Sequence, residues 1–316
     1  MMYAAAQFHG HVAPGQDVPV PRRGLRAAIS CRGVGLHGGQ EVNLRFAAAE
    51  PGSGIRFRRT DLGVTIPARH DLVADTRLCT VLADPARPEA RIGTVEHVMA
   101  ALAGLGIDDA LVEVDGPEIP ILDGSAAEFV FLLNCSGIVE TGLPRDIIEI
   151  RRPVRVSDGS AFAELRPAAQ GEYGFSAALQ IDFPARAIGR QALSLEITPE
   201  SFAAELARAR TFTMKQDIDR LREAGLALGG TLANAVVVDG DEVINPEGLR
   251  SPDEFVRHKL LDVVGDLALA GAAIRGRFVG ARTGHRLNNL LLRALFADRA
   301  NYRFAGVAEP DLAAVA

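Results

Sequence analysis

The stretch Asp253-Glu254-Phe255-Val256-Arg257-His258-Lys259-Leu260-Leu261-Asp262-Val263-Val264-Gly265-Asp266 has the apolar periodicity of one helix. His258, Asp262 and Asp266 are spaced four residues apart, which places all three side chains on the same helical face. An imidazole and a carboxylate at this spacing can hold one metal ion, and a carboxylate one turn further on can orient a neighbouring group. A solvated polar stripe on an amphipathic helix would have the same spacing, so the rest of the chain must distinguish the two interpretations.

The composition is that of an ordinary globular chain. Of its 316 residues, 48% are hydrophobic and 23% are charged, enough to bury one large core or two smaller ones. The net charge of -6 gives no reason to expect a nucleic-acid partner, and no apolar run approaches the length needed for stable membrane insertion. Cys31, Cys79 and Cys135 are far apart and odd in number, which argues against a disulfide framework and favours a reducing compartment, the cytoplasm.

The order of expected elements repeats once along the chain. In the first half, β-prone runs between 25 and 82 precede a helix that Thr94 would cap, a strand over 110–114 and a helix that Ser125 would cap. In the second half, strands between 147 and 197 precede helices over 199–208 and 215–224 and a strand over 235–238. The second half ends with the helix of the stretch quoted above, expected over 253–270, then a strand over 274–282 and a last helix from 285 to about 297.

This repetition predicts an α+β fold of two similar domains packed as a sandwich, with the active site at the domain interface. We expect the first α+β domain over 23–144 and the second over 145–300. Residues 1–22 lack the basic and apolar regions of a secretory signal and are expected to form a disordered leader. Residues 301–316 are expected to form a tail.

Glu96 and His97 lie in the first turn of the expected helix of the first half. The helix N-terminus alone favours a glutamate there, and His97 could be a capping or core histidine. The pair also suits metal-dependent hydrolysis, in which the histidine binds the metal and the glutamate takes a proton from the attacking water. Together with His258 and Asp262, His97 would supply three protein ligands and leave a fourth position open, as in catalytic zinc sites.

Three further polar residues could take part in chemistry. His285 opens the last helix, either as an ordinary N-terminal residue or as an imidazolium whose pKa a carboxylate such as Asp266 would raise. Thr211 lies between two helices and could cap the following segment or donate to an oxyanion. Lys259 projects about 100° away from its neighbour on the helix, so it would flank the metal, where it could meet a carbonyl, a phosphate or water.

Two other segments have open interpretations. The apolar residues between 210 and 230, among them Phe212 and Met214, either belong to a satellite core or line a passage for a lipid chain. The glycine-rich loop over 33–39 fits neither phosphate-binding loop pattern, so we interpret it as a tight turn in which His37 has at most an indirect role.

Longer strings of the sequence resemble one family, the zinc-dependent UDP-3-O-acyl-N-acetylglucosamine deacetylases, which catalyse the committed step of lipid A synthesis in Gram-negative bacteria. The resemblance covers about residues 23–297. It rests on the strings over 33–37, Thr94-Val95-Glu96-His97, 100–108, 117–125, Ala209-Arg210-Thr211-Phe212, 253–266, Gly284-His285 and Leu287-Asn288-Asn289.

The resemblance implies a set of roles for the metal and the proton transfers. One Zn2+ ion per chain would be held by His97, His258 and Asp262. Glu96 would be the general base, and His285 the general acid, oriented by Asp266. In the family the two α+β domains form a sandwich, as the order of elements here also predicts.

The resemblance also implies a substrate, a UDP-sugar that carries a lipid-like acyl chain. Thr211 would help to hold the oxyanion, and Lys259 would bind substrate. Residues 212–230 would form the acyl passage, with Phe212 and Met214 in it, and Cys79 would line the site near the metal. Met214 stands where the family usually has an aromatic residue and Thr213 where a glycine is common, which bears on the preferred chain length.

Other functions remain open on the sequence alone. The chain could be a zinc amidohydrolase that acts on another, soluble N-acyl sugar, although the apolar segment 212–230 argues for a lipid tail. It could also be a non-catalytic, zinc-stabilised binding module, but structural zinc sites are usually closed and rich in cysteine, and the cysteines here do not cluster. The small, apolar residues 310–316 suggest recognition by a quality-control protease or, more simply, a frayed terminus.

Overall fold

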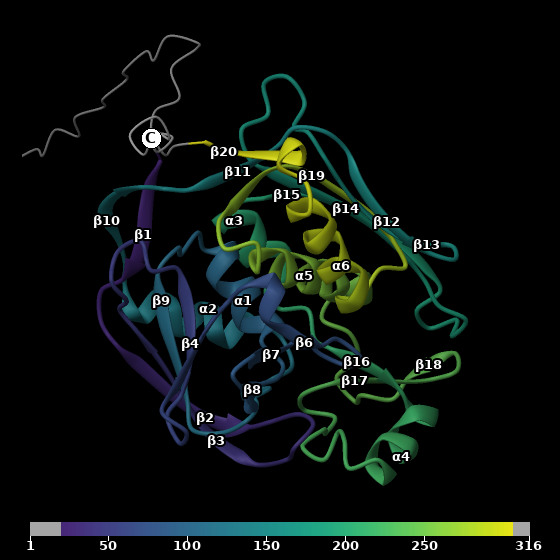
Figure 1. Ribbon diagram of the computed structural model, residues 1–316. Coiled ribbons are helices and arrows are strands. Elements are labelled where there is room, and N and C mark those ends of the chain that lie inside the picture. Colours follow the sequence, from purple (N-terminus) through teal and green to yellow (C-terminus); the bar gives the residue numbers. More distant parts are fainter. Residues whose placement is uncertain (1–19, 306–316) are drawn as a thin grey trace, which may run out of the picture.

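The computed structural model of the protein describes residues 20–305, which form two outer sheets with helices between them (Figure 1). Helices α1 (Glu96–Gly104) and α2 (Ala127–Ser136) come from the first half of the chain, and α5 (Glu254–Ala268) and α6 (His285–Phe296) from the second. Helices α1 and α5 pack against each other in the middle layer. The predicted α+β fold class is confirmed.

The first sheet has five strands in the order β2-β3-β9-β4-β5. Along β3, Val42, Leu44 and Phe46 are buried while the residues between them are exposed, so the sheet has one face on the core. A separate pair and a small three-stranded sheet flank it. The strands of this half are β1 (Pro21–Leu25), β2 (Ile29–Val34), β3 (Glu41–Ala47), β4 (Ile55–Arg59), β5 (Val64–Pro67), β6 (Val73–Asp75), β7 (Val81–Asp84), β8 (Arg87–Ile92), β9 (Ala110–Val114) and β10 (Ile138–Pro144).

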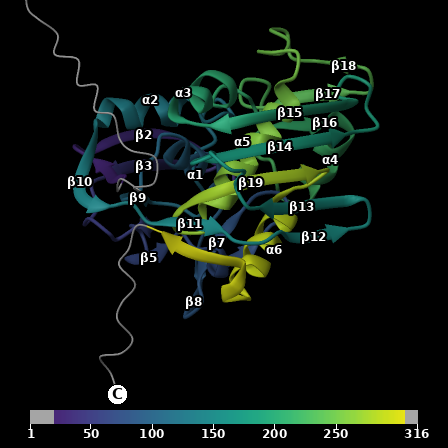
Figure 2. The same ribbon diagram turned by 90° about the horizontal axis from the view of Figure 1, so that it is seen from above.

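The second large sheet has seven strands, and β19 (Ala273–Ala281) pairs with β11, β13 and β14. Its buried face, which includes Leu165, Leu179 and Phe278, packs toward α5 and α6, so the sheet lies on the opposite side of the middle helices from the first sheet (Figure 1). Figure 2 shows its strands from above. The other strands are β11 (Ile147–Ile150), β12 (Val154–Asp158), β13 (Ala161–Arg166), β14 (Phe175–Asp182), β15 (Arg190–Ile197) and β20 (Tyr302–Ala305).

A smaller unit stands at one end of the sandwich, at the lower right of Figure 1. It contains a three-stranded sheet of β16 (Phe212–Met214), β17 (Val236–Asp239) and β18 (Glu242–Val243), together with α4 (Lys215–Glu223). The helix expected over 199–208 is shorter and irregular: α3 (Pro199–Ser201) continues as a π-helical turn over Phe202–Leu206. Phe202, the first residue of this turn, is fully buried against Gly104 of α1, where an added Cβ would lie 2.3 Å from its ring.

Several local expectations need correction. Thr94 does not cap α1 through its side chain: its φ is 58°, the helix is preceded by Val95, and the Thr94 hydroxyl donates to Glu118 instead. Strand β1 includes Pro21 and Arg22, which the expected leader contained, because the Arg22 guanidinium is buried against Asp109. Residues 1–19 lie outside the described residues.

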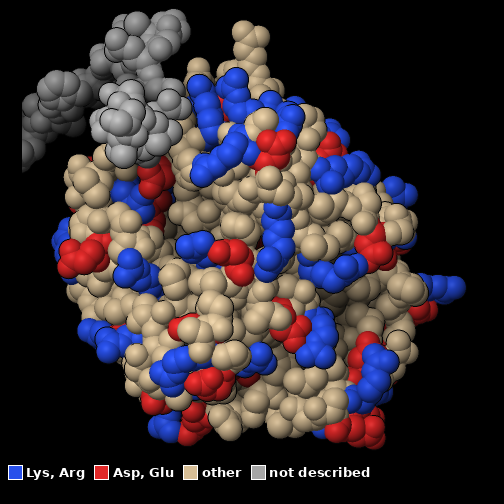
Figure 3. Space-filling view, in the orientation of Figure 1, with Lys and Arg blue, Asp and Glu red and all other residues tan. Residues whose placement is uncertain are grey.

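The expected tail also begins later than residue 301. Residues 302–305 form β20, which is antiparallel to β11, so they belong to the second sheet. Residues 306–316, including the segment 310–316, lie outside the described residues. Among residues 20–305, no helix combines the length and the apolar character needed to cross a lipid bilayer. Acidic and basic side chains are interspersed on the face shown in Figure 3.

Candidate active site

The site forms where α1 and α5 touch. An added Cβ at Gly265 would lie 2.0 Å from the carbonyl oxygen of Glu96, so only glycine permits this approach of the two helices. The contact brings the first turn of α1, with Glu96 and His97, beside the face of α5 that presents His258, Asp262 and Asp266. Residues 96 and 266, which are far apart in the sequence, therefore enter one site.

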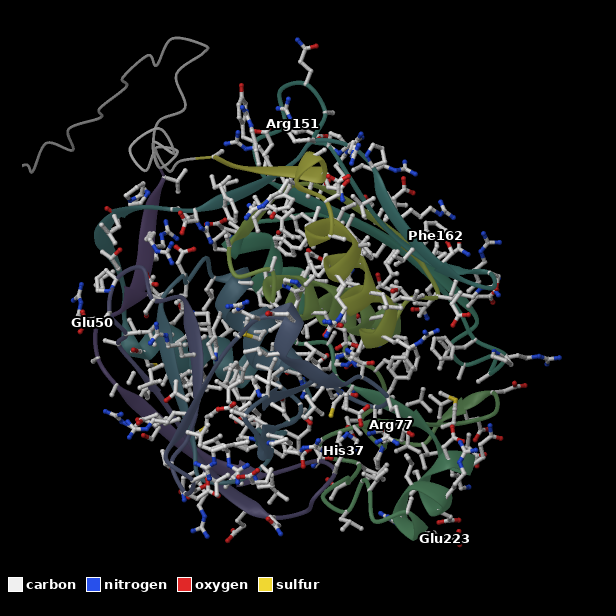
Figure 4. The ribbon with its side chains drawn as sticks, viewed as in Figure 1. His37, Glu50, Arg77, Arg151, Phe162 and Glu223 are labelled. Atoms are coloured by element: carbon white, nitrogen blue, oxygen red, sulfur yellow. The ribbon has the colours of Figure 1, made fainter. Side chains whose placement is uncertain are left out.

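A cavity of about 200 Å³ opens at this junction. It lies between the helices, the loop that carries His37 and the start of β16, and Figure 4 labels His37, one of its lining residues. Most of the predicted site residues line it. The lining residues are Leu36, His37, Leu78, Cys79, Thr94, Glu96, His97, Phe183, Thr211, Phe212, His258, Lys259, Asp262 and His285.

Three buried side chains in the cavity meet the requirements of a metal site. One potential ligand atom from each of His97, His258 and Asp262 lies within 4.8 Å of the others. Asp262 Oδ1 is 3.4 Å from His258 Nε2 and 3.8 Å from His97 Nε2. It is buried and has no hydrogen-bond partner among residues 20–305. A buried carboxylate oxygen without a donor is costly, so the donor set fits a cation at this position.

Further contacts orient the potential ligand atoms of His258 and Asp262. His258 Nδ1 is 3.0 Å from the carbonyl oxygen of Ala209, which leaves Nε2 directed at the centre of the triad. The Lys259 ammonium donates to Asp262 Oδ2 over 2.5 Å, which leaves Oδ1 for a metal. Ala209 is fixed in turn because its neighbour Arg210 is buried and bonds to Glu254 with Nε–Oε1 at 2.8 Å.

The electrostatics of the triad suit metal ligation. Burial, assisted by the nearby His258, lowers the pKa of His97 to about 3, and burial also lowers the pKa of His258. Both imidazoles are therefore neutral near pH 7, as ligands must be. Burial opposes ionisation of Asp262, but Lys259 and the histidines outweigh it and hold its pKa well below the usual range. Asp262 in turn raises the pKa of Lys259 against the effect of burial.

Glu96 and His285 face each other across the cavity. His285 Nδ1 lies 2.9 Å from Asp266 Oδ2, and its Nε2 lies 3.8 Å from Glu96 Oε1. Burial raises the pKa of Glu96 to about 7. Burial alone would lower the pKa of His285, but the carboxylates of Asp266 and Glu96 outweigh it and raise that pKa to about 9.

The remaining predicted residues divide between the cavity wall and its surroundings. Thr211, Phe212, Lys259 and Cys79 line the cavity. Burial of the Cys79 thiol, together with the nearby Glu96 carboxylate, raises the pKa of the thiol to about 12, so the thiol is neutral near pH 7. Met214 does not line the cavity: it lies at the end of β16, partly buried against the core.

His37 lines the cavity directly, whereas the sequence indicated at most an indirect role for it. Its backbone N–H donates to Glu118 over 2.9 Å, which folds the loop over 33–39 toward the cavity. Both ring nitrogens are buried without a hydrogen-bond partner in the described part of the chain, and burial lowers the pKa of the imidazole. A histidine among glycines was the available signal, but the carboxylate that positions it lies 81 residues further along the chain.

Comparison with known proteins gives consistent matches. The family described as UDP-3-O-acyl N-acetylglycosamine deacetylase matches residues 22–297. The UDP-3-O-acyl-N-acetylglucosamine deacetylase of Shewanella sp. (strain W3-18-1) is 48% identical over 282 residues, which cover 88% of this chain and 90% of that protein. The proteins of that name from Idiomarina loihiensis (48% over 289 residues, 90% and 92%) and Anaeromyxobacter sp. (strain Fw109-5; 47% over 282 residues, 89% and 90%) are similarly close.

Proposed function

The chain belongs to the UDP-3-O-acyl-N-acetylglucosamine deacetylase family, and from this premise we propose that it removes the N-acetyl group of a UDP-3-O-acyl-N-acetylglucosamine in lipid A synthesis. Water adds to the acetamide carbonyl carbon, the C–N bond breaks, and acetate and a sugar amine are released. One observation carries the proposal. A metal-ligand triad and a glutamate–histidine pair with complementary pKa shifts converge in a single cavity.

We propose Zn2+, one ion per chain, as the resident metal. His97, His258 and Asp262 would hold it through two imidazole nitrogens and one carboxylate oxygen, a ligand set that leaves a fourth position open, as catalytic zinc sites do. The unpartnered Oδ1 of Asp262 supports this assignment. When bound, the ion supplies Lewis acidity at the reacting carbonyl and water.

Glu96 acts as the general base in this proposal. Its Oε2 accepts a hydrogen bond from the backbone N–H of Thr80 over 3.0 Å, which anchors the carboxylate and leaves Oε1 facing His285 across the cavity. With a pKa of about 7, the carboxylate is basic enough to accept a proton from water and is still largely ionised in mildly alkaline solution.

His285 acts as the general acid. Asp266 accepts the hydrogen bond from Nδ1–H, so the protonated ring directs Nε2–H at the cavity, where the leaving amine can receive it. Thr211 supplies a hydroxyl for the oxyanion: its backbone is fixed by bonds from its N–H to Gly124 and from Val236 to its carbonyl, both of 2.8 Å.

The substrate is held by residues around the triad. Lys259 presents a cation that is available to the carbonyl or the diphosphate, while Phe212 and Cys79 give an apolar wall. We propose that the segment 212–230 receives the acyl chain and that Met214 influences chain length through the packing of β16.

Three broader proposals accompany this function. The boundary between two α+β domains lies near residue 145, because β10 pairs with β1 in the first half while β11 pairs with β19 and β20. The protein works in the cytoplasm, in keeping with its three free cysteines. A quality-control protease reads the segment 310–316, and equal cellular half-lives of the full chain and a 1–309 truncation would argue against this.

The test is deacetylation of UDP-linked N-acetylglucosamines that carry 3-O-acyl chains of graded length, with and without a chelator. We expect one acetate per sugar, a marked preference for long chains, and loss of activity with the chelator. Activity independent of chain length would point to an amidohydrolase for another N-acyl sugar. Binding without any acetate release would point to a binding module.

A further inference from the structure

Thr80 contacts the proposed base, Glu96, and the carboxylate that orients the proposed acid, Asp266, without lining the cavity. It is 1% exposed. Its backbone N–H donates to Glu96 Oε2 over 3.0 Å, and its hydroxyl donates to Asp266 Oδ1 over 2.6 Å. Glu96 belongs to α1 and Asp266 to α5, so one residue connects the proposed base to the carboxylate that orients the proposed acid.

Donors reach both oxygens of the Asp266 carboxylate. Its Oδ2 accepts from His285 Nδ1 at 2.9 Å and from the Asn288 amide at 2.8 Å, while its Oδ1 accepts, among residues 20–305, only from the Thr80 hydroxyl. The Thr80 bond therefore helps to fix the rotation of the carboxylate plane about its Cβ–Cγ bond, together with the two donors on Oδ2. Without that bond, a buried charged oxygen would lose its donor and the carboxylate could turn away from His285.

The distance between the two proposed catalytic groups makes this anchoring important. Glu96 Oε1 and His285 Nε2 are 3.8 Å apart, which is too long for a hydrogen bond. The two groups attract each other as an ion pair but share no hydrogen bond, so their spacing and orientation also depend on the groups that hold each of them. Thr80 contacts Glu96 directly and contacts His285 indirectly, through Asp266.

We propose that Thr80 is a positioning residue for the hydrolysis, which holds Glu96 through its N–H and Asp266 through its hydroxyl so that base and acid keep their separation across the cavity. This inference rests on the proposed function and goes beyond it by naming a residue that touches neither substrate nor metal ligand. The side chain acts through Asp266 on His285, and the backbone acts on Glu96.

Replacement of Thr80 by valine tests the hydroxyl alone, because valine keeps the shape and the backbone N–H. Loss of a hydrogen bond to a charged, buried group predicts a fall in kcat of roughly tenfold to a hundredfold, with KM within about threefold of the wild type. Metal content should stay unchanged. Thr80→Ser restores the donor and should recover kcat to within about threefold, and Thr141→Val, which removes a partly buried hydroxyl elsewhere, should match the wild type.

A double-mutant cycle separates positioning from general stability. If the Thr80 hydroxyl acts through Asp266 on His285, then Thr80→Val should change kcat by less than about threefold in a His285→Ala background. If Thr80 only stabilised the fold, Thr80→Val would lower kcat by the same factor in both backgrounds. Thr80→Ala serves as a second variant if the valine protein does not fold, with the same expected loss and the same cycle.

Specific results would overturn the inference. These are kcat near the wild-type value in the folded Thr80→Val or Thr80→Ala protein, no recovery in Thr80→Ser, or equal losses with and without His285. Each can be read only against an active wild-type enzyme. If the wild type releases no acetate from the UDP-linked substrate, it is the proposed function that fails, and the two failures are therefore distinguishable.

Discussion

The pKa values of Glu96 and His285, the two proposed proton-transfer residues, are raised by different causes. Glu96 loses solvation and its pKa rises to about 7, whereas His285 gains more from Asp266 and Glu96 than burial takes away, and its pKa rises to about 9. Between these values the glutamate is ionised and the histidine protonated, which is the combination that a base and an acid need for amide hydrolysis.

Substitution of Glu96 or His285 should lower kcat without loss of bound metal. We expect Glu96→Gln and His285→Gln each to lower kcat by a factor of about 10² or more, because each removes one proton-transfer group. Metal analysis should still find stoichiometric metal. Glu89→Gln, which neutralises an exposed carboxylate on β8, is the matched control. Deacetylation near the wild-type rate in either purified variant would refute the assigned role.

The pH dependence of kcat/KM follows from the same two groups. The ionised form of Glu96 is lost as the pH falls through about 7, so activity should rise with pH across that range. The protonated form of His285 is lost as the pH rises through about 9, so activity should fall above it. A bell-shaped profile measured from pH 5 to 11 is expected, and Glu96→Gln should lose the acidic limb. A flat profile would contradict the assignment.

At the scale of elements, α5 was the most predictable part of the site. The spacing of His258, Asp262 and Asp266 is set by the helical repeat alone, so their common face could be predicted before their partners were known. The helix over 253–270 corresponds to Glu254–Ala268. The exact fit of α5 to α1 was not visible, because it depends on Gly265 meeting a backbone carbonyl of another helix.

That fit gives a prediction for Gly265→Ala. The new Cβ would lie 2.0 Å from the Glu96 carbonyl oxygen, so α1 and α5 must move apart. We expect a loss of about 1–3 kcal/mol in the free energy of unfolding by denaturant titration, together with lower kcat because the two sets of catalytic residues separate. Gly174→Ala is the control, since its nearest neighbour is a side-chain oxygen at 3.5 Å. Equal stability of the two variants would disprove the close contact.

At the scale of the whole molecule, the sandwich joins groups that the sequence keeps far apart. The α+β class, the repeated order of elements and the helices of the site could be predicted from periodicity, and the resemblance to a family suggested the roles. The contacts of Thr80 with Asp266 and of His37 with Glu118 could not, because they span 186 and 81 residues and carry no local pattern. Such pairings are fixed only when both sheets close over the middle helices.

The most direct measurement is acetate release from the UDP-linked substrate by protein stripped of metal and then titrated with Zn2+. We expect the stripped protein to be inactive and to recover its full rate at about one ion per chain, as a single three-ligand catalytic site requires. Asp262→Ala should not recover at that concentration, whereas Asp253→Ala, which removes a partly buried ion pair with Arg257 at the start of α5, should. Undiminished turnover in verified metal-free protein, or full recovery of Asp262→Ala at one equivalent, would contradict a metal-dependent deacetylase centre between α1 and α5.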